Sequence, residues 1–290
     1  MTEKIKKPKI IGIGEVVFDI LPDKRKLGGA PVDFLRHAVK NGAEGCLISA
    51  IGADDLGREV ISELKKFEIS HLLSITPYPT GRVLIFNNPS NGYTAHILEN
   101  AAWDYIPFTE DAKNAIQKTD ALYFGTLALR KPYSQGTILD LIDEAPETCY
   151  KFFDVNLRQN YYNASIIEQL LKRANILKLN IEELKILTSL FKLPTNIENS
   201  CMQLKEKYDL KYVLFTNGTK ESQIFGDDVV TKVQNPSLEQ AFSYGAGNAF
   251  AGAFISSILR GCTQQEAHQQ ANNTAVEVCL LNQKQSSQGA

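Results

Sequence analysis

The stretch "AFSYGAGNAFAGAF", from Ala241 to Phe254, starts with residues suited to an anion site and continues as a buried helix. Gly245, Ala246 and Gly247 give the start of this helix a nearly bare backbone. Successive N–H groups at a helix start, together with the positive end of the helix dipole, attract phosphate groups. The same small residues also permit close helix packing. The stretch alone therefore supports an anion site and a packing ridge about equally.

Strands and helices alternate along most of the chain. Residues 9–21 are predicted to form a strand with a charged interruption, followed by a turn over 22–31 and a helix over 32–43. Such alternation predicts a parallel sheet with helices on both faces. Further strands are expected at 45–52, 121–130, 149–158, 175–180 and 211–222, further helices at 54–69, 137–145, 165–174, 181–191, 247–260 and 264–281, and a hairpin at 222–234.

Residues 77–103 interrupt this pattern. The segment "PTGRVLIFNNPSNGYTAHILENAAW", residues 79–103, contains two alternating strands around the turn residues "NNPSNG". This pattern is typical of a β-hairpin. Inside an α/β chain, such a hairpin is a candidate flap over a cleft. One domain spanning residues 1–290 with this flap is the simplest organisation.

The composition excludes several classes of function. A net charge of −2 gives no electrostatic reason to expect nucleic acid or a membrane surface as a partner. The five cysteines and four histidines are scattered, without the spacing of a disulfide framework or a zinc site. No apolar run reaches the roughly 18 residues that span a bilayer. We expect a cytoplasmic protein.

Polar residues follow most of the predicted strands. In an open parallel sheet, ligands gather at the carboxyl ends of the strands. Each residue also has a plain explanation, since a helix cap, a strand edge or a surface ion pair would account for it. Together they predict a polar crevice with the anion site at its end: Asp19, Gly28, Gly29, Gly125, Asp154, Asn156, Arg158, Asn180, Glu183, Thr216 and Gly218.

Several longer motifs occur in order along nearly the whole chain. They are "GEVVFDILPDKRKLGGAP" (14–31), "IGADDLG" (51–57), "PTGRV" (79–83), "AAWDYI" (101–106), "FGTLALR" (124–130), "FDVNLRQNYY" (153–162), "LNIEEL" (179–184) and "AFSYGAGNAF" (241–250). In these motifs the chain resembles the ribokinase-like (PfkB) carbohydrate kinases, and among them the bacterial fructokinases most. A nucleoside kinase, which uses the same scaffold, is disfavoured by the fructokinase-like segments at 124–130 and 153–162.

The resemblance implies a Rossmann-like α/β domain with a small β-sheet lid, built mainly from strands near 11–21 and 79–103. It implies an ATP-dependent transferase that phosphorylates a sugar hydroxyl. The implied cofactors are ATP and Mg²⁺, with a monovalent cation as a further candidate. Lid strands in this family often pair between subunits, so the exposed hairpin edges favour a homodimer, with a monomer as the alternative.

The resemblance also assigns roles to individual residues. The sugar would contact Asp19, Gly28 and Gly29. Arg158 would lie near the transferred phosphoryl group, and Glu183 would organise Mg²⁺ through water. The remaining roles fall on two groups: Thr216, Gly218, Asn272 and Asn180 around the nucleotide, and Gly245, Ala246, Gly247 and Asn248 as the anion hole.

The signature departs from the family pattern at its last position. The family's catalytic base is an aspartate, and this chain has Asn248, whose amide cannot accept a proton at neutral pH. General base catalysis is worth about 10²–10⁴ in rate. Phe242 and Ser243 replace the Asp-Thr pair that opens the signature, and Glu221 replaces a glycine near the nucleotide. Two functions stay open: a kinase with impaired activity, and a non-catalytic sugar- or nucleotide-binding protein (a pseudokinase).

A second departure lies in the sugar motif. The family continues Gly-Gly-Ala-Pro-x-Asn, and here the last residue is Asp33. One hypothesis is that Asp33 restores a carboxylate to the crevice, as a substitute base or as a redirected sugar contact. The alternative is independent drift in a protein released from catalysis.

Overall fold

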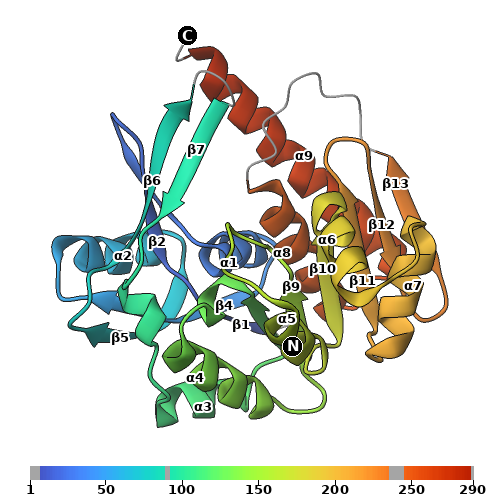
Figure 1. Cartoon of the computed structure of the whole chain (residues 1–290), viewed down its shortest axis with the longest axis horizontal. Helices are drawn as coiled ribbons and strands as arrows, with labels where there is room; N and C mark the ends of the chain where they lie inside the picture. Colours follow the sequence, from blue (N-terminus) through green and yellow to red (C-terminus); the bar gives the residue numbers. More distant parts are fainter. Residues whose placement is uncertain (1–6, 89–91, 235–244, 289–290) are drawn as a thin grey trace, which may run out of the picture.

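Two β-sheets organise the chain (Figure 1). The computed structural model describes residues 7–88, 92–234 and 245–288. Within them, the large sheet has nine strands in the order β13 (Val230–Gln234), β12 (Glu221–Phe225), β11 (Tyr212–Asn217), β10 (Ile176–Asn180), β9 (Tyr150–Asp154), β8 (Ala121–Gly125), β1 (Lys9–Ile13), β4 (Glu44–Gly52) and β5 (Ile69–Thr76). The small sheet has the order β3 (Arg25–Gly28), β2 (Val17–Ile20), β6 (Gly81–Asn88) and β7 (Gly92–Ile97).

The large sheet is mostly parallel. All pairings from β5 through β11 are parallel, and the two pairings at one edge, β11 with β12 and β12 with β13, are antiparallel. This confirms the expected sheet. The carboxyl ends of the parallel strands therefore lie along one edge of the sheet.

Helices pack on both faces of this sheet, as expected. Neighbouring residues of β1 face opposite ways, so Ile10 and Ile11 belong to two separate apolar layers. One layer contains α1 (Ala30–Lys40), α2 (Asp55–Lys66), α8 (Ala246–Leu259) and α9 (Gln264–Gln288). The other contains α3 (Glu110–Ile116), α4 (Pro132–Asp143), α5 (Ala164–Leu171), α6 (Ile181–Phe191) and α7 (Ile197–Lys207).

The prediction of one strand over residues 9–21 is wrong. The run divides into β1, in the large sheet, and β2, in the small sheet. Glu15 lies at the break, and its buried carboxylate accepts a hydrogen bond from Ala30 N at 3.0 Å. Residues 11–13 are thus not part of the small sheet. The predicted turn over 22–31 also contains a strand, β3, which pairs with β2.

The hairpin predicted within 79–103 is confirmed. Strands β6 and β7 pair antiparallel, with residue 83 opposite 97 and residue 88 opposite 92. Residues 89–91 of the expected turn lie outside the described part of the chain. Strand β5 and helices α3 and α7 were not anticipated. None of the described helices is long and apolar enough to cross a membrane.

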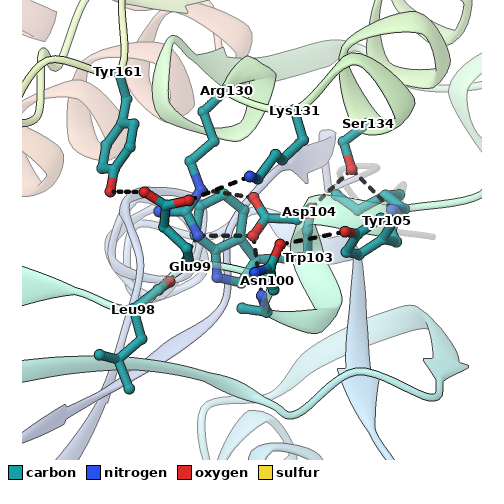
Figure 2. Close-up of polar contacts among 12 residues, drawn as sticks. Leu98, Glu99, Asn100, Trp103, Asp104, Tyr105, Arg130, Lys131, Ser134 and Tyr161 are labelled. Carbon is teal, nitrogen blue, oxygen red and sulfur yellow. Dashed lines mark hydrogen bonds and ion pairs between the residues drawn. The ribbon is translucent and has the colours of Figure 1, made fainter.

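A buried ion pair fixes the chain where it leaves this hairpin (Figure 2). Arg130 donates to both carboxylate oxygens of Asp104, at 2.7 and 2.8 Å, and to Leu98 O at 2.7 Å. Both charged side chains are almost completely buried. The guanidinium lies between the rings of Trp103, at 4.0 Å, and Tyr161, at 4.8 Å. The segment after β7 is thereby held against the loops that follow β8 and β9.

Candidate active site

The first turn of α8 is a partly buried row of backbone donors. Gly245 precedes the helix in the left-handed conformation, with φ +79°, and no side chain of the described residues caps the helix start. This backbone angle is what requires glycine at position 245. The first-turn N–H groups have no acceptor within their own helix. The N–H groups of Ala246, Gly247 and Asn248 are thus suited to an anion.

Lys178 lies directly beneath this turn. A Cβ on Gly247 would lie 3.0 Å from Lys178 Nζ, so the glycine makes room for the ammonium group. We expected Gly247 to keep the backbone clear for an anion. The structure gives another reason for the small residue, since the lysine fills the space that a side chain would take.

Two polar side chains, Asp154 and Tyr123, join Lys178 to Asn248. Lys178 Nζ contacts both oxygens of Asp154, at 2.9 and 3.0 Å. The hydroxyl of Tyr123 donates to Asp154 Oδ2 at 3.0 Å and lies 3.5 Å from Asn248 Oδ1. Burial, followed by the nearby charge of Asp154, raises the pKa of Tyr123 well above its usual value. Tyr123 therefore remains protonated. We call Gly245–Asn248 with Tyr123, Asp154 and Lys178 the α8 corner.

Asn180 and Glu183 form a reciprocal cap at the start of α6. Asn180 Oδ1 accepts from Glu183 N at 2.9 Å, and Glu183 Oε2 accepts from Asn180 N at 2.8 Å. The other oxygen of Glu183 accepts from Leu157 N at 3.2 Å. Burial raises the pKa of Glu183, and the charge of Lys178 opposes that rise. Asn180 and Glu183 thus form the helix cap that was one explanation for these two residues.

The described residues contain no group of three or more carboxylate, histidine or cysteine side chains that could hold a metal ion. Both oxygens of Glu183 already accept backbone hydrogen bonds. A magnesium ion usually keeps several waters and binds substrate phosphates with one or two carboxylates. Glu183 therefore fits Mg²⁺ through water and does not fit a protein cage around the ion.

The loop that carries Arg158 connects several parts of the site. Asn156 and Gln159 flank it with positive φ angles of 38° and 49°, which are unusual for residues with side chains. Leu157 N binds Glu183, and Gln159 Nε2 donates to Ala95 O of β7 at 3.3 Å. The loop thus contacts both the α6 cap and the small sheet.

Asp19 and the two glycines of the sugar motif lie together at the start of α1. A Cβ on Gly28 would lie 3.1 Å from Asp19 Oδ2. Gly29 caps the start of α1 with φ +110°, and any side chain there would collide with the backbone oxygen of Glu15. Burial raises the pKa of Glu15, while the charge of Arg158 lowers it. We call Glu15, Asp19, Gly28, Gly29 and Asp33 the α1 corner.

Asp33 lies in the first turn of α1 and contacts Arg36 in the same helix at 3.4 Å. Burial raises the pKa of Asp33 to about 6. The charges of Lys26 and Arg36 lower it, and the charge of Asp19 raises it. Asp19 and Asp33 are thus electrostatic neighbours. In the described part of the chain, no hydrogen bond joins Asp33 to Asn248.

The expected nucleotide residues lie around β10, β11 and α9. Thr216 pairs in register with Asn180, and Gly218 follows in the turn after β11. Asn272 is buried on α9. One helical turn earlier, His268 contacts Ser222 and Thr231 through its two ring nitrogens, at 2.9 and 2.7 Å, which fixes α9 against β12 and β13.

The pattern of the pfkB family carbohydrate kinases matches residues 15–288. The chain belongs to this family. An ATP-dependent 6-phosphofructokinase of Thermoanaerobacterium thermosaccharolyticum is 23% identical, over 90% of this chain and 85% of that protein. A fructokinase of Salmonella typhimurium is also 23% identical, over 86% and 84%. The crystal structure of Vibrio cholerae O395 fructokinase with fructose, ADP and calcium ion is 20% identical and covers 92% of this chain and 91% of that one, with a TM-score of 0.77.

Sequence reasoning missed three residues of this candidate site. Glu15, Tyr123 and Lys178 were not selected, although each is a polar residue in or beside a buried strand. A lysine inside the apolar strand "NILKLN" is the signal that could have found Lys178. Phe242 and Ser243 of the signature lie outside the described residues.

Proposed function

We propose that this pfkB-family member is an ATP-dependent sugar kinase of the fructokinase type with impaired turnover. The observation that carries the proposal is the uncapped start of α8, which stands over Lys178 and carries Asn248 in its first turn. Backbone amides in this arrangement suit a terminal phosphate. The α1 corner supplies a buried carboxylate, Asp19, for the hydroxyls of a sugar.

On the sugar side, Asp19 accepts hydrogen bonds from the substrate, and Gly28 and Gly29 leave room for it. The small sheet, which carries Asp19 on β2, serves as a lid over the sugar. A fructose-type substrate is supported by the relatives named fructokinase. An equally similar relative is named 6-phosphofructokinase, so substrate identity needs a direct test.

On the phosphate side, the backbone amides at the start of α8 receive the transferred phosphoryl group. Arg158 stabilises its charge from the loop after β9. When bound, ATP supplies the phosphoryl group and Mg²⁺ offsets its charge. Glu183 orients the water around the metal ion, and the nucleotide lies against Asn180, Thr216, Gly218 and Asn272.

The missing base decides how fast such a kinase can work. Asp154, the carboxylate linked to Asn248 through Tyr123, is buried and bound to Lys178 and Tyr123, so it is not free to accept a proton from a sugar. Asp33, with a pKa near 6, is the carboxylate that we propose as a substitute base or as an additional sugar contact. The second candidate function is that of a pseudokinase. It is favoured by the same hydrogen bonds and ion pair of Asp154, which leave this carboxylate unable to act as a base.

A coupled ADP-release assay on a panel of sugars, with the parent chain beside Asn248→Asp, tests the proposal. Restoring the base should raise turnover by roughly 10²-fold or more. Turnover in the variant alone would identify a kinase that has lost its base. No turnover in either chain, while calorimetry still detects sugar binding, would contradict the kinase and support the pseudokinase.

A further inference from the structure

Lys178 is a charged residue in an otherwise apolar strand. It lies in β10 and is only 5% exposed. Burying an ammonium group is unfavourable unless an opposite charge accompanies it. Asp154 supplies that charge through both oxygens, and Tyr123 donates to the same carboxylate. The pair is therefore well held from the side of the sheet.

On the side that faces α8, the surroundings of the Lys178 ammonium group are electrostatically less favourable. Lys178 Nζ packs against the first turn of α8, at Gly247. The N-terminus of a helix carries a partial positive charge, so a cation placed there is repelled. Ion pairs that serve folding alone can often be replaced by apolar residues without loss of stability. An anion at the start of α8 would turn this repulsion into an attraction.

We propose that Lys178 is a positioning residue that supplies a fixed positive charge beneath the α8 corner and strengthens binding of the terminal phosphates of a nucleoside triphosphate; this rests on the function proposed above. The first turn of α8 lies between Lys178 and the phosphate. Lys178 acts through its field, which is strong because the surroundings are buried and poorly screened. Asp154 and Tyr123 keep the ammonium in place.

The test separates this role from a structural one with a charge-neutral double variant. Lys178→Met alone leaves the buried carboxylate of Asp154 unpaired and is expected to destabilise the fold. Asp154→Asn combined with Lys178→Met removes both charges and keeps an acceptor for Tyr123. Lys205→Met is the matched control, because Lys205 forms an ion pair with Asp227 at 2.7 Å in another part of the fold.

Calorimetric titrations with Mg·ATP and with adenosine provide the readout, and thermal unfolding checks the fold. We expect the double variant to unfold near the temperature of the parent, to bind Mg·ATP about tenfold more weakly, and to bind adenosine unchanged. The control should bind both as the parent does. If the double variant does not fold, Lys178→Gln, which keeps a donor for Asp154, replaces it, and the same changes in the binding of Mg·ATP and adenosine are expected.

Equal Mg·ATP affinity in a folded double variant and the parent would overturn the role of Lys178 and leave the kinase proposal standing. An equal loss of affinity for ATP and adenosine would also overturn it, because the lysine would then shape the nucleoside pocket. A parent chain that binds no Mg·ATP would overturn the proposed function and this inference together.

Discussion

Tyr123 has a single hydroxyl proton, and the position of that proton decides whether Tyr123 can link Asn248 to a base. The hydroxyl is closer to the carboxylate of Asp154, at 3.0 Å, than to Asn248, at 3.5 Å, so its proton goes to the carboxylate. The raised pKa of Tyr123 prevents it from acting as a base. A proton released by a sugar hydroxyl therefore has no acceptor among Tyr123, Asp154 and Asn248. Asp33 is the remaining carboxylate that we propose as the acceptor.

The pH dependence of any sugar phosphorylation tests Asp33. A base must be unprotonated, and burial raises the pKa of Asp33 to about 6. We expect the rate to rise as the pH increases through about 6 and then to level off. Asp33→Asn should remove this rise. A variant with the same profile and rate as the parent would show that Asp33 is not the base.

At the scale of single elements, the division between β1 and β2 illustrates what the sequence could predict. Apolar periodicity predicted extended structure over 9–21, but periodicity does not reveal that the chain changes sheets at Glu15. That change depends on a hydrogen bond to Ala30 N, which forms only in the folded protein. The helices α1 and α8 and the parallel strands β8, β9 and β10 were predictable because their patterns are local, whereas β2 and β3 of the α1 corner were not resolved from the sequence.

The candidate site residues were assigned by family resemblance, and their roles stay a prediction. The fold places two of the assigned pairs close together, Asp19 near Asp33 and Asn180 beside Thr216. Lys178 was not selected from the sequence, because its proposed role depends on its distance to Gly247, which lies on a helix remote in sequence. Such long-range contacts leave no mark in local spacing.

The buried ion pair after the hairpin allows an element-scale prediction. Asp104→Asn should lower the unfolding free energy by about 3–5 kcal/mol, because it leaves the charge of Arg130 buried without a partner. Asp143→Asn is the matched control, since the pair of Asp143 with Arg173 is partly exposed, and should change stability by less than about 1 kcal/mol. Urea unfolding measures both. Equal losses would contradict the account of the Asp104 pair.

At the scale of the whole molecule, the proposed function requires the two sheets to contribute different halves of one site. The α1 corner follows the small sheet, and the α8 corner lies at the carboxyl ends of the large sheet. The loop of Arg158 connects the small sheet to the cap of α6, because Gln159 binds the backbone of β7 and Leu157 binds Glu183. This arrangement favours cooperation between the small sheet and the phosphate site.

The small sheet also carries our proposal of a homodimer. Its outer strands, β3 and β7, are edges that a second copy could extend. We expect light scattering after size-exclusion chromatography to give twice the chain mass of 32.2 kDa. A mass of one chain across the accessible concentration range would contradict the dimer without affecting the site.

Calorimetry with Mg·ATP and fructose on the parent chain and on Asp19→Asn tests the site as a whole. The account predicts that the parent binds one of each per chain. It predicts that Asp19→Asn loses fructose and retains Mg·ATP. Absence of nucleotide binding in the parent, or loss of Mg·ATP with fructose binding intact in the variant, would contradict it.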